Sequence, residues 1–128
     1  MRPKIVAANW KMHTTLPEGL QLTSELIQAL QKLDLAGVQV ILLPPFTHLA
    51  AISQLLPASG DIHLGAQNCH TQAQGAFTGE VAAPMLRAVG TRFVLIGHSE
   101  RRQHGGEDSA LLAQKVPAAI AQGLRPIF

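Results

Sequence analysis

Short apolar runs alternate along the chain with longer amphipathic stretches. The apolar runs predict five strands, at residues 5–8, 38–43, 62–66, 93–96 and 125–128. Apolar positions spaced three and four residues apart predict helices at about 17–33, 47–56, 83–89 and from 108 to about 122. Because strands that are apolar throughout are buried on both faces, this order indicates an α/β fold with a parallel sheet covered by helices.

Several residues are placed where helices usually begin or end. Pro17 suits a first helical turn, Thr47 and Asp108 suit N-caps, and Gly123 suits a helix end. Pro117 falls inside the last predicted helix, where a proline is expected to kink or interrupt it.

Composition narrows the class of protein. Apolar residues make up 47% of the chain, enough for a core, whereas charged residues make up only 14%. Such a low charged fraction suggests that part of the surface is covered, either by further residues of the chain or by a partner.

The net charge of +2 argues against nucleic-acid binding, and no apolar run approaches the length of a membrane span. A single cysteine, Cys69, fits a reducing compartment, and we expect a cytoplasmic protein. The apolar final strand leads us to expect a truncated domain.

The carboxyl ends of the strands are where an α/β sheet carries its chemistry. After the first strand, alternation puts Asn9 and Lys11 on the inner face and Trp10 toward the helices. A lysine at this position can stabilise an anionic substrate or a developing oxyanion. Alternatively, Lys11 simply reaches solvent past the strand end.

His98 follows the fourth strand. Alternation predicts that it shares the inner face with Val94 and Ile96, at the start of a short helix whose dipole favours neutral imidazole. Neutral imidazole can donate a hydrogen bond to a carbonyl oxygen, although a buried histidine with a satisfied hydrogen bond is the alternative. Glu100 either forms a structural ion pair with Arg101 or supports Lys11.

The stretch 67–80 predicts a long loop between the third strand and the next helix. Phe77 on this loop is expected to contact another chain, or else to anchor the loop on its own domain. Cys69 is expected to be buried. The remaining histidines lack metal-ligand spacing and are expected mostly at the surface, with no metal site: His13, His48, His63, His70 and His104.

Three segments in this order and spacing resemble the triosephosphate isomerase family: Ala8-Asn9-Trp10-Lys11-Met12, Gly65-Ala66-Gln67-Asn68-Cys69 with Gly75-Ala76-Phe77-Thr78-Gly79-Glu80, and Ile96-Gly97-His98-Ser99-Glu100-Arg101-Arg102. The resemblance implies a (β/α)8 barrel. Residues 1–128 would be its N-terminal half, about (β/α)4 plus the start of strand 5, with the domain truncated there.

The resemblance also implies a function. The family interconverts dihydroxyacetone phosphate and glyceraldehyde 3-phosphate, in glycolysis and gluconeogenesis, without a cofactor. Lys11 and His98 would be catalytic, and Asn9 and Lys11 would bind the triose phosphate. Glu100 would support Lys11, Ser99 beside it would have a supporting or interface role, and Thr78 would reach the active site of a neighbouring subunit in a homo-oligomer.

The family places its glutamate base after strand 6 and its phosphate-binding glycines after strands 7 and 8, beyond the length of this chain. We therefore expect an isomerase-type site that is incomplete, with little or no activity. Two alternatives remain open. The half barrel could associate with itself as a structural or interaction module, or it could bind a phosphorylated ligand weakly.

Overall fold

A computed structural model describes residues 2–58 and 60–128 of the chain. Its centre is a five-stranded sheet in which every neighbouring pair is parallel and the strand order follows the sequence. The strands are β1 (Lys4–Asn9), β2 (Val38–Leu43), β3 (Ile62–Ala66), β4 (Phe93–Leu95) and β5 (Arg125–Ile127). The predicted parallel α/β architecture is confirmed, as a curled half of a (β/α) barrel.

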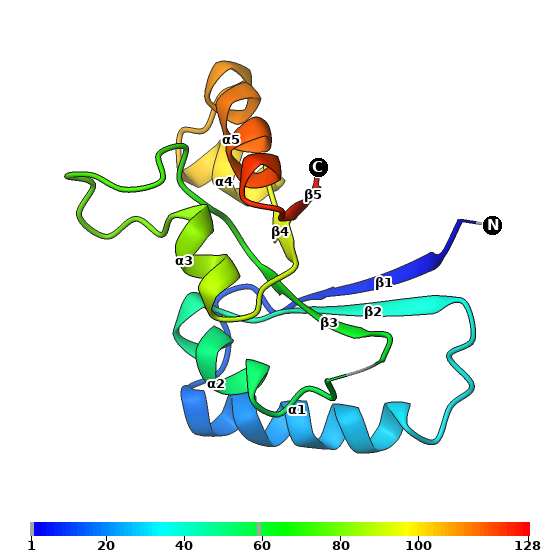
Figure 1. Ribbon diagram of the computed structural model, residues 1–128. Helices are drawn as coiled ribbons and strands as arrows, with labels where there is room; N and C mark the ends of the chain where they lie inside the picture. The colour runs from blue at the N-terminus through cyan, green and yellow to red at the C-terminus, as the bar shows by residue number, and fades with distance from the viewer. Residues whose placement is uncertain (1, 59) are drawn as a thin grey trace.

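Helical segments connect consecutive strands. They are α1 (Leu16–Leu30), the 3-10 turn η1 (Phe46–His48), α2 (Leu49–Ser53), α3 (Ala83–Ala88), α4 (Ser99–His104) and α5 (Ser109–Ala121). They lie along one side of the curled sheet and leave the other side open, while the loop of residues 67–80 projects away from the body (green, left in Figure 1).

The two faces of the sheet have different cores. Between sheet and helices lies the larger cluster, in which Leu64, Val94 and Ile96 pack with Leu86 and Leu112 of the helices. On the concave face lies a smaller cluster of Ile41, Leu43 and Phe93, with Leu95 and Ile127 against it. The barrel interior is therefore only partly filled by the residues described.

The helix-side position of Val94 and Ile96 corrects one prediction. We expected these two side chains to share the inner face with His98, but Phe93 and Leu95 occupy that face instead. His98 still reaches the concave side because β4 ends at Leu95, and Gly97 then adopts a positive φ of 75° that breaks the alternation.

Local chemistry explains where the longer helices begin. The backbone N–H of Thr15, the N-cap of α1, donates to Glu18 Oε2 over 2.7 Å, and this hydrogen bond lowers the pKa of Glu18. Asp108 caps α5 as predicted, because its Oδ1 accepts from the Leu111 N–H over 2.8 Å. Pro17 lies in the first turn of α1, also as predicted.

Three details of the predicted helices were wrong. Thr47 is not an N-cap, since it lies inside η1, which begins at Phe46. Helix α1 ends at Leu30 and leaves Leu33 61% exposed beyond it. Pro117 does not interrupt α5, which runs from Ser109 to Ala121. The proline has no N–H to donate to the carbonyl of Ala113, but both residues are exposed, so solvent can reach that carbonyl.

Strand β1 lies at one edge of the sheet and is poorly covered on both sides. Ile5 is 51% exposed and Val6 is 57% exposed, and side chains of consecutive strand residues point to opposite faces. Parallel strands are normally buried on both faces. Among the described residues, no helix is long and apolar enough to cross a membrane.

Candidate active site

The carboxyl ends of the strands surround an open cleft of about 420 Å³ on the concave side. Four predicted site residues line it: Asn9, Lys11, His98 and Glu100. The structure therefore brings together residues that are up to 91 positions apart in the sequence, as the positions of the strand ends predicted.

The backbone of Lys11 is held in an unusual conformation at the mouth of this cleft. Its φ is 56°, a left-handed value that non-glycine residues seldom adopt. Its N–H donates to Asn9 Oδ1 over 2.9 Å, and its carbonyl accepts from Gln67 Nε2 over 2.8 Å. Such conformations persist where surrounding contacts fix them, and they gather at functional sites.

The side chain of Lys11 forms an ion pair with Glu100 across the cleft. Nζ donates to Glu100 Oε1 over 2.6 Å, while about half of each side chain stays exposed. This hydrogen bond is the main reason that the pKa of Glu100 lies below its usual value. The predicted support of Lys11 by Glu100 corresponds to this contact. The other partner considered, Arg101, donates instead to Glu107 over 2.6 Å.

The ring of His98 is oriented by the chain that follows it. The backbone N–H of Glu100 donates to His98 Nδ1 over 3.1 Å, and a nitrogen that accepts a hydrogen bond carries no hydrogen. In this arrangement Nε2 carries the ring hydrogen and is the donor that remains for a ligand. The nearer Glu100 carboxylate oxygen lies farther from Nδ1, at 3.7 Å, than the backbone nitrogen does.

Two predicted residues do not line the cleft. Ser99 begins α4 beside His98 and is exposed. Thr78 lies on the projecting loop of residues 67–80, also exposed. Phe77 on the same loop is 45% exposed and packs against His70, with ring centroids 4.3 Å apart. Within one chain the loop thus anchors part of its aromatic surface and leaves the rest in solvent.

Gln67 is the main site residue for which sequence reasoning assigned no role. Its Nε2 donates to the Lys11 carbonyl and also to the Leu43 carbonyl, over 2.8 Å in each case. Gln67 therefore connects β3 to β2 and to the lysine loop, which joins β1 to α1 and carries Lys11. Its position directly after β3, comparable to that of Asn9 at the end of β1, was the signal that could have identified it.

Two histidines that we expected at the surface are buried. His48 is 2% exposed and His63 is 7% exposed. Burial lowers the pKa of His63, and the nearby charge of Arg92 adds to the effect. Single-sequence reasoning places histidine outside by default because it is polar, but each ring has a side chain within hydrogen-bond distance, Thr14 for His48 and Arg92 for His63.

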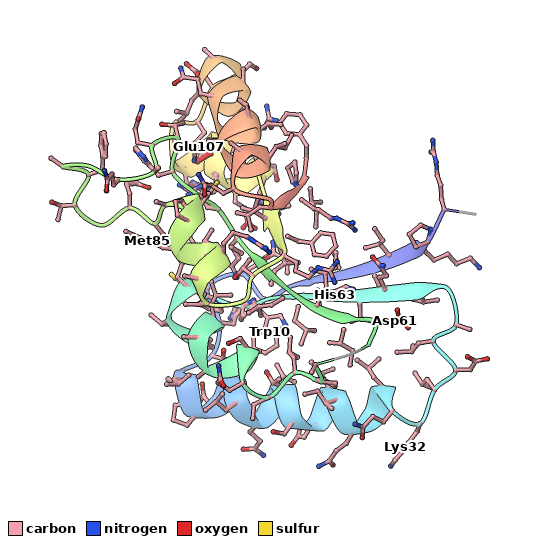
Figure 2. All side chains as sticks on the ribbon, in the orientation of Figure 1. Trp10, Lys32, Asp61, His63, Met85 and Glu107 are labelled. Carbon is pink, nitrogen blue, oxygen red and sulfur yellow. The ribbon has the colours of Figure 1, made fainter. Side chains whose placement is uncertain are left out.

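A buried charge network lies behind the cleft, at the position of Glu107 in Figure 2. Glu107 Oε2 accepts from Arg101 Nε over 2.6 Å and from Lys115 Nζ over 3.0 Å, and Lys115 also donates to Asn68 Oδ1 over 2.8 Å. Burial opposes ionisation of Glu107, but the two cations outweigh it and keep its pKa low. The network ties Glu107, just before α5, and Lys115, in the middle of α5, to Asn68 and Arg101 on the cleft wall.

The cleft offers a fixed cation and one imidazole N–H. Donors of this kind stabilise negative charge on an oxygen atom. Across residues 2–58 and 60–128, no group of three or more His, Cys, Asp or Glu side chains comes together as a metal site. Cys69 is buried, as predicted, and burial raises the pKa of its thiol.

A curled parallel sheet with helices outside it and polar side chains at its carboxyl end defines part of a (β/α)8-barrel protein. The family model described as triosephosphate isomerase matches residues 4–128. The chain belongs to the triosephosphate isomerase family.

Curated relatives agree with this assignment. A triosephosphate isomerase of Amoebophilus asiaticus is 53% identical over 128 residues, which is 100% of this chain and 51% of the relative. That of Chloroflexus aurantiacus is 50% identical over 127 residues, 99% of this chain and 50% of the relative. That of Cytophaga hutchinsonii is 45% identical over 128 residues, 100% of this chain and 50% of the relative. The chain therefore spans about half the length of the curated relatives it matches.

Proposed function

We propose that this chain supplies the electrophilic half of a triosephosphate isomerase site. The observation that carries the proposal is the pair of contacts made by Glu100. Its carboxylate holds the Lys11 ammonium, and its backbone N–H fixes the His98 ring. One residue thus orients both groups that would act on the substrate carbonyl.

The proposed chemistry is electrostatic. Removal of a proton beside the carbonyl of dihydroxyacetone phosphate or glyceraldehyde 3-phosphate leaves an enediolate, whose negative charge lies on oxygen. The Lys11 cation and the His98 Nε2–H would stabilise that charge, because preorganised donors need no reorientation as it develops. Asn9, whose Oδ1 is occupied by Lys11, would bind substrate through its amide nitrogen.

The proton itself needs a base, and the cleft lining contains one carboxylate among the described residues, Glu100. That carboxylate is paired with Lys11, and its lowered pKa makes it a poor proton acceptor. We therefore propose that the 128-residue polypeptide by itself shows little or no isomerase turnover.

A coupled assay with glyceraldehyde 3-phosphate tests this part of the proposal. We expect purified wild-type protein and a Lys11→Met variant to give the same background rate, since a contaminating isomerase would not respond to the substitution. Turnover in the wild type that the variant abolishes would show that the chain has a base of its own.

A chimera tests the electrophilic role directly. Joining residues 1–128 to the remaining half of the Amoebophilus asiaticus relative should give an active isomerase, because the two proteins are 53% identical over the joined stretch. Substituting Lys11→Met or His98→Gln in the chimera should then reduce kcat by at least about a hundredfold. A folded chimera that keeps its activity with both substitutions would refute the assigned roles.

We also propose that residues 1–128 are the N-terminal half of the barrel domain and that the domain acts as a homo-oligomer. The exposed loop carrying Phe77 and Thr78 supports the second point, because it projects from the body rather than packing over its own cleft. Thr78 would then approach the cleft of a neighbouring subunit.

Self-association of the half barrel is the second candidate function. The exposure of Ile5 and Val6, on opposite faces of an edge strand, specifically favours it. An edge strand with apolar residues on both faces is a site where another sheet can add. A second copy of the chain is the occupant available in a purified sample.

A further inference from the structure

His48 lies under the loop that joins β1 to α1, the loop that carries Lys11. The residue comes shortly after the two prolines that follow β2, and it is only 2% exposed. Both ring nitrogens have partners. Nδ1 lies 2.8 Å from Thr47 Oγ1, while Nε2 lies 2.9 Å from Thr14 Oγ1 and 3.2 Å from the Thr14 carbonyl oxygen.

The partners fix which nitrogen carries the hydrogen. A carbonyl oxygen can only accept, so the contact with the Thr14 carbonyl requires Nε2–H as donor. Nδ1 is then free to accept from the Thr47 hydroxyl. His48 therefore connects η1, which contains Thr47, to Thr14 in the lysine loop.

Helix α1 packs closely against one side of the ring. A Cβ built on Gly19 of α1 would overlap His48 Cδ2 and come within 3.0 Å of Nε2. Gly19 is buried, and the helix packs directly on the imidazole through it. Any side chain at position 19 would push the ring away from Thr14.

The loop held in this way is strained at two positions. Lys11 has a φ of 56° and Thr14 a φ of 74°, both in the left-handed region that β-branched and long side chains avoid. Asn9 and Gln67 hold the backbone of Lys11 itself. At the other strained residue, Thr14, His48 contacts both the hydroxyl and the carbonyl.

We propose that His48 is a positioning residue for Lys11. Its Nε2–H holds Thr14, which fixes the far end of the strained loop and so keeps the Lys11 ammonium aligned with Glu100. The importance of that alignment for catalysis rests on the proposed function, whereas the alignment itself can be measured without any turnover.

The first test uses the unmodified chain. Nitrogen-15 NMR of the histidine rings distinguishes a nitrogen that bears hydrogen from one that does not. For His48 we expect hydrogen on Nε2 and a lone pair on Nδ1. The opposite tautomer would overturn the proposal, because Nδ1–H cannot reach Thr14.

Two substitutions separate positioning from packing. In His48→Gln the side-chain amide nitrogen comes close to the former Nε2 and can still donate to Thr14. In His48→Asn the shorter amide comes close to Nδ1 and keeps only the Thr47 contact. Both variants remove the ring, so a role in packing alone would make them behave alike.

The readout is amide hydrogen exchange, compared between the loop and the sheet. In the asparagine variant we expect the Lys11 amide to exchange about tenfold faster relative to the amides of Ile41 and Leu42 in β2, as the loss of one hydrogen bond would give. In the glutamine variant the ratio should stay near that of the wild type. Equal acceleration at Lys11 in both variants, or none in either, would refute the positioning role.

The measurement remains decisive if one variant does not fold. Should His48→Asn fail to fold, the glutamine variant alone must keep the wild-type exchange ratio and the Lys11 Nζ chemical shift of the ion pair. Faster exchange there would contradict the proposal. A chimera without isomerase activity would leave these results unchanged, so failure of the proposed function and failure of this inference are distinguishable.

Discussion

The ion pair between Lys11 and Glu100 is half exposed, and exposed pairs contribute little to stability. Its surroundings are nevertheless specified in detail. Two side-chain hydrogen bonds hold the lysine backbone at a positive φ, and a third residue holds the loop beyond it. Contacts of this number around a surface charge are typical of a group whose position matters more than its contribution to folding.

Replacing Lys11 by methionine should therefore change the site without unfolding the protein. The side chains are similar in length, but the cation that lowers the pKa of Glu100 is removed. We expect the pKa of Glu100 to rise toward its ordinary value in a carbon-detected NMR titration, while the melting temperature hardly changes. A pKa of Glu100 that stays low in the variant would mean that Lys11 is not its main partner.

Glu107 should behave in the opposite way because it is buried between two cations. Glu107→Gln keeps the shape but leaves Lys115 and Arg101 without a counter-charge, which should cost about 3 kcal/mol of folding stability at neutral pH. The pKa of Glu107 is lowered in the folded state. Its ionisation therefore stabilises the fold above the unfolded-state pKa, and this contribution is lost as the pH falls through the folded value.

The check is denaturant unfolding of both proteins across a pH series at low protein concentration. The stability difference between wild type and Glu107→Gln should be largest near neutrality. It should shrink as the pH falls below about 4.3, the unfolded-state pKa of a glutamate, toward the lower pKa of the folded carboxyl. A difference that stays constant into acid would show that lost packing, rather than lost charge, is responsible.

The positions of the candidate site residues were predictable from the sequence to the extent that they depended on strand ends. The positions of Lys11 and His98 follow from where β1 and β4 end, and the cleft confirms that both lie at the same edge. The burial of His48 and His63 depends on partners distant in sequence, Thr14 and Arg92, which no local pattern reveals. The face taken by His98 depended on the backbone angle of Gly97, which the sequence alone does not specify.

Helix α5 illustrates how elements tolerate a residue that disfavours them. Its buried side chains, Leu112, Lys115 and Ala119, lie on one face, while Pro117 is exposed on another. The helix continues through the proline because packing of the buried face outweighs the lost backbone hydrogen bond. Local propensity predicted a break here because it does not include that packing.

Pro117→Ala should therefore stabilise the protein by about 2 kcal/mol, since alanine restores an N–H donor and favours helix in an exposed position. Pro84→Ala is the matched control. Pro84 lies in the first turn of α3, where an N–H has no partner within the helix, so its replacement should be near neutral. Urea unfolding of the three proteins measures both. Equal effects at the two positions would attribute the change to the unfolded state instead.

The buried strands were predicted closely, and the short helix that follows β2 was not. Strands β2 and β3 match their predicted bounds of 38–43 and 62–66. The predicted helix at 47–56 is instead η1 followed by the five-residue α2. Short helical turns after a strand are set by how the chain packs against its neighbours, so their boundaries carry little local signal.

The chain as a whole is a curved sheet whose outer side is covered and whose inner side is partly empty. The helix-side cluster is large and well buried, whereas the concave cluster has three buried members. The order of the strands in the half barrel was predictable from the sequence.

The uncovered surface at β1 leads to a prediction about assembly. If β1 is the contact, wild-type protein should elute as a dimer or larger species in size exclusion with light scattering, and Val6→Lys should shift it toward monomer because a charge cannot be buried there without a partner. Leu33→Lys is the matched control, an equal change at a residue 61% exposed beyond the end of α1. It should leave the assembly unchanged.

A wild-type monomer at high concentration would rule out self-association through β1. A loss of assembly in both variants would point to general apolar exposure rather than to this edge. Loss in Val6→Lys alone would identify β1 as the surface that a second half of the barrel, from another copy, covers.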